Sequence, residues 1–205
     1  MQGTVDHKHP EVMDAVIFAA KSGVLKARRG VIDCLDGRVR RWQKGTATAG
    51  VVLSEVETAL YTESDANERA LQLGKVQNLR VGATAFDGVH LRAGEVLSFW
   101  AQVGRPTRTK GFVEGRELRQ GCLIPTLAGG LCQLSNSLYQ AARQAGCEIV
   151  ERHGHTAPIP NSPFPPGEDA TVFWNYVDLR FRAHRSVVLR VRLTADSLIV
   201  RVEAG

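Results

Sequence analysis

A cysteine that follows two glycines stands out in the middle of the chain. Gly129 and Gly130 let the backbone turn tightly, and apolar residues then recur every three or four positions, which predicts a helix over residues 133–145. Cys132 therefore falls at the first turn of that helix. Unpaired N–H groups and the positive end of the helix dipole stabilise a thiolate there, and the thiolate is the nucleophilic form. The segment predicts a nucleophile; the alternative is a cysteine buried as a small apolar side chain.

Two histidines downstream could serve Cys132 as a base. His153 and His155 follow an apolar stretch, and a strand over residues 149–155 would place both side chains on one face. Two histidines on one face can act as a base with an orienting group, as a pair of metal ligands, or as hydrogen-bonded structural residues. With a cysteine nearby in the chain, we expect them to belong to a site.

A carboxylate could complete a Cys-His-carboxylate relay, because it would fix the tautomer of the histidine and support the imidazolium that forms. Asp169 lies where a proline-rich loop (residues 158–166) re-enters a strand, and Asp178 shares a predicted strand face with Arg180. The structural alternatives are a turn cap for Asp169 and an ion pair with a neighbouring arginine for Asp178. Both aspartates stay candidates on the sequence alone.

Four ordered blocks of the chain resemble the bacterial VanW-like family, which is named for a member of some vancomycin-resistance gene clusters. They cover residues 99–107, 129–139, 150–156 and 169–182, within a region that extends from Lys75 to Val191. The resemblance implies an association with the cell envelope, with peptidoglycan peptides or with specialised metabolism. Polar and aromatic side chains of these blocks are the candidate substrate-binding residues: Gln133, Ser135, Asn136, Tyr139, Arg152, Trp174 and Arg180.

These residues support three interpretations. The first is a cysteine-dependent amide or ester hydrolase, or an acyltransferase, acting on a peptide-like or amino-acid-derived substrate without a cofactor. The second is a non-catalytic module that binds a peptide or a peptidoglycan fragment. The third is a metal-dependent enzyme with Cys132, His153 and His155 as ligands. We expect the first, with a small-molecule or peptide substrate as the partner.

The elements that must position these residues predict an α+β fold. A helical N-terminal arm, residues 1–74, would contain a helix from Pro10 and a second one from Ser54 to about Leu73, with Ser54 as N-cap and Glu57 completing a capping box. The VanW-like core, residues 75–205, would hold a mostly antiparallel sheet and one internal helix that starts at the Gly-Gly-Leu-Cys turn. Alternating apolar residues predict its strands, at residues 76–83, 89–91, 96–100, 173–182, 189–193 and 200–203, and Asp196-Ser197 predicts a hairpin between the last two.

Composition excludes several classes of protein. The chain has 205 residues, of which 43% are hydrophobic and 23% charged, as in globular domains rather than disordered or fibrous ones. The apolar run at residues 15–20 is far shorter than the ~20 residues of a membrane span, and the start lacks the pattern of a secretory signal. Four cysteines are too few for a disulfide scaffold, which predicts a cytoplasmic location.

Positive charge is concentrated near the N-terminus. The net charge is +5, and residues 21–44 contain eight basic and two acidic side chains. No zinc-finger spacing, RNA-binding aromatic motif or helix-turn-helix pattern accompanies this charge, so we expect no nucleic-acid partner and interpret the basic residues as a solvated face. The oligomeric state stays open.

Overall fold

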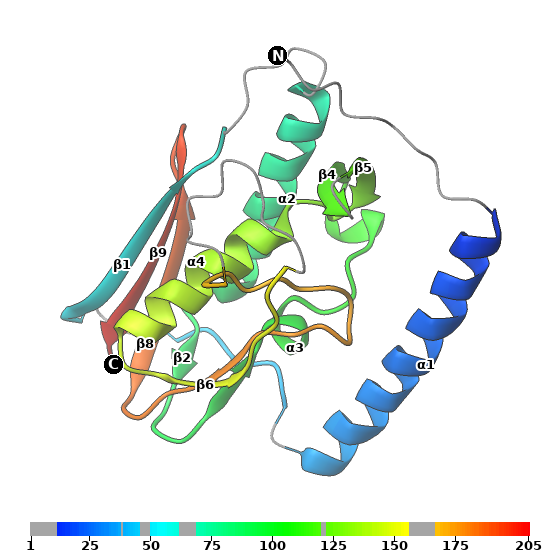
Figure 1. Ribbon diagram of the computed structural model, residues 1–205. Helices are drawn as coiled ribbons and strands as arrows, with labels where there is room; N and C mark the ends of the chain where they lie inside the picture. The colour runs from blue at the N-terminus through cyan, green and yellow to red at the C-terminus, as the bar shows by residue number, and fades with distance from the viewer. Residues whose placement is uncertain (1–11, 38, 46–49, 62–68, 120–121, 156–166) are drawn as a thin grey trace.

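The computed structural model describes residues 12–37, 39–45, 50–61, 69–119, 122–155 and 167–205, and the proline-rich segment predicted as a loop lies outside these ranges. Its helices and antiparallel sheets confirm the α+β prediction, with a helix ahead of the sheet core (Figure 1). None of the described helices has the length and apolar character needed to cross a membrane. The predicted helix of the N-terminal arm is α1, Val12–Asp36.

The main sheet has the strand order β1-β9-β8-β2, and every neighbouring pair is antiparallel. Val56 of β1 lies opposite Val200 of β9, which in turn lies opposite Val191 of β8. The hairpin predicted around Asp196 is confirmed, since it joins the last two strands. The strands are β1 (Val52–Ala59), β2 (His90–Leu91), β8 (Val187–Leu193) and β9 (Ser197–Ala204).

The helix predicted from Ser54 is wrong, because residues 52–59 form strand β1. Burial alternates along this strand: Ser54, Val56 and Thr58 are buried, whereas Glu55 and Glu57 are exposed. The Ser54 hydroxyl does not cap a helix but donates to the carbonyl oxygen of Ala141, 2.7 Å away and 87 residues later in the chain. The capping-box pattern therefore belongs to an edge strand with period two.

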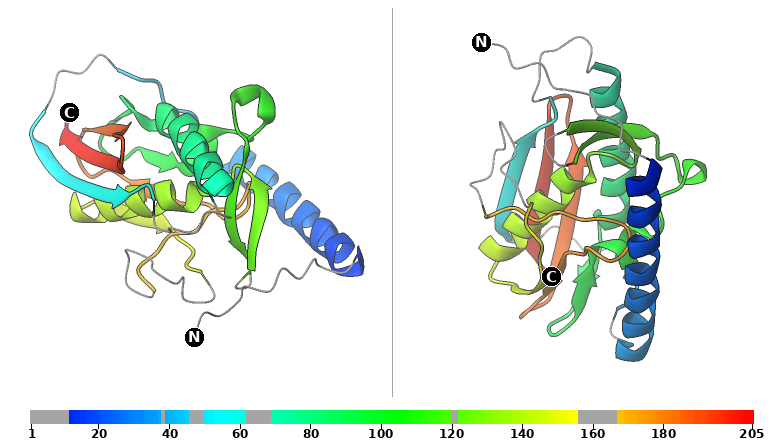
Figure 2. Two further views of the ribbon diagram at one scale, coloured as in Figure 1. Left: turned by 90° about the horizontal axis from the view of Figure 1, so that it is seen from above. Right: turned by 45° about the vertical axis from the view of Figure 1, so that its right-hand side comes forward.

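Two helices, α2 (Arg69–Phe86) and α4 (Leu131–Gln144), cover one face of the main sheet (Figure 2). The strand predicted at residues 76–83 is wrong, since this stretch belongs to α2 and its buried residues Val76, Leu79 and Ala83 follow a helical spacing. Gly82 lets the two helices approach, because a Cβ there would lie only 2.9 Å from Leu134 Cδ2.

A smaller antiparallel sheet has the order β3-β7-β6. Two of its strands are shorter than predicted. The strand predicted at residues 149–155 ends at Glu151, before the histidines. In the strand predicted at residues 173–182, residues 173–177 instead form a turn closed by a bridge between Phe173 and Val177. Residues 99–103, predicted in part as a strand, are helical. The remaining elements are β3 (Val96–Ser98), α3 (Phe99–Val103), the 3₁₀ turn Arg108–Lys110, the hairpin β4 (Glu114–Arg119) and β5 (Cys122–Leu127), β6 (Glu148–Glu151) and β7 (Arg180–Arg182).

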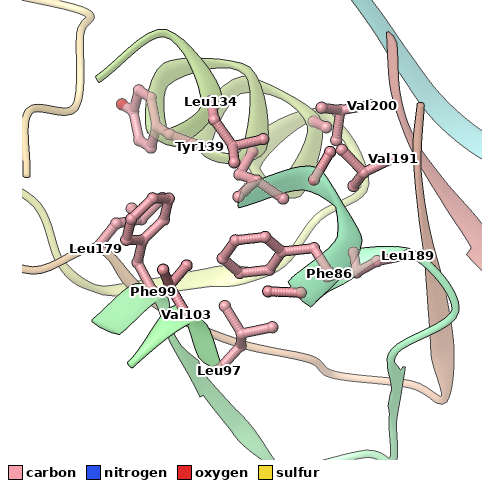
Figure 3. Close-up of a cluster of buried hydrophobic side chains, with 14 of the residues drawn as sticks. Phe86, Leu97, Phe99, Val103, Leu134, Tyr139, Leu179, Leu189, Val191 and Val200 are labelled. Atoms are coloured by element: carbon pink, nitrogen blue, oxygen red, sulfur yellow. The ribbon is translucent and has the colours of Figure 1, made fainter. Parts of the chain in front are cut away.

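The hydrophobic core lies between α2, α4 and both sheets (Figure 3). Phe86 of α2 contacts Phe99 at a ring-centroid distance of 5.2 Å, and Leu134 and Leu189 are fully buried. Burial of such side chains stabilises each by about 1.5–3 kcal/mol relative to exposure. This packing fixes α4, and with α4 the position of Cys132.

Candidate active site at the start of helix α4

The turn from β5 into α4 places Cys132 in the first helical turn. Gly130 precedes the helix with φ of 97°, a left-handed conformation that favours glycine. A Cβ at this position would also collide with the side chain of Lys75. Two independent constraints therefore require glycine directly before the helix, and they set the direction in which the cysteine projects.

The Sγ atom of Cys132 is half-buried between two segments of the C-terminal third. The hydroxyl of Thr171 lies 3.2 Å from Sγ, and the carbonyl oxygen of Val172 lies 3.8 Å from it. His155 is a further neighbour of Cys132, and the interaction between their side chains raises the pKa of the imidazole. The sulfur thus contacts a hydroxyl and interacts with an imidazole, and both groups can donate a proton.

His155 is held between Cys132 and Asp169. Its ring Nδ1 hydrogen-bonds to Oδ2 of Asp169, and its backbone N–H donates to the same oxygen at 2.8 Å. Burial lowers the pKa of His155, but the hydrogen bond and charge interaction with Cys132, followed by those with Asp169, outweigh burial and raise the pKa to about 9. The imidazolium form is therefore favoured at neutral pH.

Asp169 is buried and stays ionised. Burial would raise its pKa, but hydrogen bonds from the ring and the backbone of His155 hold the pKa below its ordinary value. Arg152 donates to the backbone oxygen of Asp169 at 2.7 Å, and the amide oxygen of Asn136 accepts from the N–H of Ala170. Asn136 thereby ties the aspartate's segment to α4.

The structure brings His155, but not His153, to the cysteine. Ring Nε2 of His153 lies 3.0 Å from Oε1 of Glu151, and the His153 side chain is exposed. Arg29 of α1 also bonds to Glu151. Burial would raise the pKa of Glu151, but the hydrogen bonds from Arg29 and His153 lower it below its ordinary value. The predicted common face fails because β6 ends at Glu151.

Asp178 lies in a different cluster. The side chain of Asp178 is 1% exposed. Its carboxylate accepts hydrogen bonds from the Ser98 hydroxyl at 2.6 Å, the Trp100 backbone N–H at 3.1 Å and Arg180 Nε at 2.8 Å. Arg180 continues to Asp33 of α1 at 2.7 Å. These bonds join β3, β7 and α1, and they give Asp178 the ion pair that was the alternative interpretation.

The candidate substrate-binding side chains have partners inside the protein. Gln133 donates to Thr58 Oγ1 at 3.0 Å and to the oxygen of Ala59 at 2.8 Å, which fastens α4 to β1. Arg152 lies over the ring of Tyr139, with its guanidinium carbon 5.5 Å from the centroid.

Trp174 packs edge-on against Trp100, with 5.3 Å between ring centroids. Ser135 differs from the other candidates. Its hydroxyl is buried and has no hydrogen-bond partner among the described residues.

Sequence reasoning missed Thr171 beside the sulfur. The signal was available, because Thr171 comes two residues after Asp169 in an extended segment and so shares its face. The backbone pairing of Thr171 N–H with the oxygen of His153, at 2.7 Å, is what brings this segment beside the histidine loop. Within the described ranges, no group of three or more His, Cys, Asp or Glu side chains could hold a metal ion.

Comparison with known proteins identifies the family. The profile described as "VanW like protein" matches residues 74–203, well over half of the chain. The chain belongs to the VanW-like family. The matched region begins in α2 and ends in β9, so it includes every residue of the candidate active site.

Two curated relatives of this VanW-like protein show how much of the chain is shared. The vancomycin B-type resistance protein VanW of Enterococcus faecalis (strain ATCC 700802 / V583) is 30% identical over 155 residues, which cover 74% of this chain and 56% of that protein. The uncharacterized protein YoaR of Bacillus subtilis (strain 168) is 35% identical over 125 residues, 60% of this chain and 41% of that protein. The chain thus spans about half the length of the curated relatives it matches, and no solved structure gives a significant match.

Proposed function

We propose that this VanW-like protein is a cysteine-dependent amide or ester hydrolase or acyltransferase, with Cys132 as nucleophile, His155 as base and acid, and Asp169 as the orienting carboxylate. One observation carries the proposal: His155 interacts with Cys132, and both its ring and its backbone are bonded to Asp169. Three separate segments supply these side chains, and this combination is the one that nucleophilic cysteine catalysis requires.

In the first step, the thiolate of Cys132 attacks the carbonyl carbon of the substrate. A C–S bond forms, and the electron pair of the C=O bond moves onto oxygen. The N–H of Gln133 donates to the carbonyl oxygen of Gly130 at 3.1 Å, whereas the N–H groups of Leu131 and Cys132 precede the first intrahelical bonds and are suited to stabilise this oxyanion. The imidazolium of His155 then donates its proton to the leaving nitrogen or oxygen as that bond breaks, which leaves a thioester on Cys132 and releases an amine or alcohol.

In the second step, neutral His155 accepts a proton from an incoming nucleophile that attacks the thioester. If the nucleophile is water, the product is a carboxylic acid; if it is an amine or alcohol, the acyl group is transferred. The sulfur leaves as a thiolate, and the protonated His155 restores the starting state. Asp169 engages Nδ1 throughout, so Nε2 is the ring nitrogen that exchanges protons with the reacting atoms.

The name of a relative supports a proposal for the substrate class. Because the Enterococcus relative is named for vancomycin resistance, we propose a peptide-like or amino-acid-derived substrate from the cell envelope or from specialised metabolism. The Thr171 hydroxyl supports the chemistry, since it can donate to the sulfur at 3.2 Å when Cys132 is a thiolate.

The test is turnover of a panel of short N-acyl peptide amides, esters and thioesters, combined with intact-mass detection of an acyl-enzyme. We expect an adduct on the wild type that is absent from Cys132→Ser, and a strong loss of turnover in His155→Gln. Cys147→Ser is the matched control, because Cys147 is also a half-buried free thiol. Peptide binding that is equal in wild type and Cys132→Ser, with turnover in neither, would favour a binding module and overturn the proposal.

A further inference from the structure

Helix α1 attaches to the core through polar side chains. Ser22 Oγ lies 3.4 Å from the hydroxyl of Tyr176, Arg29 bonds to Glu151, and Asp33 accepts from Arg180 at 2.7 Å. These three residues of α1 lie seven and four positions apart, and so share one face of the helix. Figure 1 shows α1 on the side of the molecule away from the main sheet.

The opposite face of α1 is apolar and exposed. Val24 is 69% exposed, Val31 is 61% exposed and Leu35 is 82% exposed, and Ile17 lies seven residues before Val24. A helix turns about 100° per residue, so this stripe lies roughly opposite Ser22 and Arg29. A surface helix ordinarily turns its apolar face to the core. This helix does the reverse, and its apolar stripe has no partner among the described residues.

The charge beside this stripe is positive. Lys21 and Arg28 are exposed next to it, while Asp33, the acidic residue of α1 whose side chain the structure describes, is bound to Arg180. After α1 the chain continues into a hollow of about 550 Å³ whose lining includes Arg40, Arg41, Lys44 and Arg92, together with Glu95, which pairs with Arg40. A second copy of this helix would bring Lys21 and Arg28 against like charges, so the partner should be anionic.

We propose that α1 binds an anionic phospholipid surface. The helix would lie parallel to the membrane plane, with Ile17, Val24 and Val31 inserted among the acyl chains near the headgroups. Lys21 and Arg28 would extend their apolar stems along the same surface and place their charges at the phosphates. Apolar insertion and basic charge act together here, which is the combination that stable peripheral binding requires.

Vesicle flotation of the full chain tests this binding. Vesicles of phosphatidylcholine with about 30% of the anionic lipid phosphatidylglycerol are compared with vesicles of pure phosphatidylcholine. We expect the protein to bind the anionic vesicles, and to bind the neutral vesicles at least roughly tenfold more weakly. The double variant Lys21→Gln/Arg28→Gln and the double variant Val24→Ser/Val31→Ser should each weaken anionic binding roughly tenfold.

The matched control is Leu73→Ser, which removes an apolar side chain of α2 that is 54% exposed, and it should leave binding unchanged. Circular dichroism checks that each variant stays folded. Equal binding to neutral vesicles, unchanged binding of the Val24→Ser/Val31→Ser variant, or no vesicle binding at all would each overturn the proposal. A further outcome is a wild-type dimer in light scattering that the Val24→Ser/Val31→Ser variant abolishes, with no vesicle binding by either protein. That result would assign the apolar stripe to contact with a second copy of the chain instead.

Discussion

The ring Nδ1 and the backbone N–H of His155 both bond to Oδ2 of Asp169, so one carboxylate oxygen fixes the histidine at two points. The backbone bond, 2.8 Å long, anchors the loop, and the ring bond sets the orientation of the imidazole toward Cys132. This double attachment is the geometric basis of the predictions on the site.

The imidazole of His155 should titrate near pH 9. Its pKa is raised because protonation is favoured by Cys132 and by Asp169, which together outweigh burial. Cys132→Ala removes the larger of these two favourable interactions, so the pKa of His155 should fall in that variant. Long-range ¹H–¹⁵N NMR of the imidazole measures both values. A wild-type pKa near 6.5 that Cys132→Ala leaves unchanged would contradict the interaction between Cys132 and His155.

The same interaction makes stability depend on pH. The pKa of His155 is about 9 in the folded protein and ordinarily 6.5, so the folded state binds the proton more tightly. The stabilisation is therefore fully present below about pH 6.5 and is lost as the pH rises through about 9. The difference in free energy of unfolding between wild type and His155→Gln should shrink over this range. Urea denaturation at several pH values measures it, and a difference that grows with pH would reverse the predicted sign.

Asn136 should stabilise the site segment. Asn136→Ala leaves the buried N–H of Ala170 without its acceptor, which should cost about 1–3 kcal/mol of unfolding free energy. The neighbouring variant Ser135→Ala is the control, because the Ser135 hydroxyl is buried without a partner among the described residues and its removal should cost little. Equal losses in the two variants in chemical denaturation would show that the Asn136 bond contributes nothing specific.

Asp178 should affect stability and not the reactivity of the cysteine. Asp178→Asn weakens the buried pair with Arg180 and should lower the free energy of unfolding by about 3 kcal/mol. The alkylation rate of Cys132 in the folded protein should stay within about twofold of the wild-type rate, since Asp178 bonds to Ser98 and Trp100 rather than to the site. A large fall in the alkylation rate with intact stability would instead assign Asp178 to the site.

Local signals predicted the helix at Cys132, whereas contacts distant in sequence decide much of the rest. The glycine turn and the apolar spacing that define α4 lie within about fifteen residues. Ser54 was misinterpreted as a helix cap because its partner, Ala141, is 87 residues away. A strand over residues 149–155 was likewise the wrong basis for the position of His155. Strand β6 ends at Glu151, and the loop that follows is held by the hydrogen bond from the His155 backbone N–H to Asp169.

The hydrophobic pattern of α1 also does not predict which of its faces contacts the core. An apolar stripe on a helix ordinarily indicates the buried face. Here Arg29 and Asp33 make the contacts to the core, through Glu151 and Arg180, and these ion pairs join residues more than a hundred positions apart. The basic segment, interpreted from the sequence as a solvated face, therefore contributes in part to attaching the helix.

The central claim, that Cys132 is the nucleophile of a Cys132–His155–Asp169 site, is tested most directly by competitive alkylation. Limiting iodoacetamide at pH 7 followed by peptide mass spectrometry compares Cys132 with two internal references. Cys34 is exposed, and burial raises the pKa of the Cys147 thiol, so the latter should react slowly. The account predicts that Cys132 reacts at least roughly tenfold faster than Cys34, and that His155→Gln removes this advantage. A Cys132 that reacts no faster than Cys34 in the wild type would contradict the account.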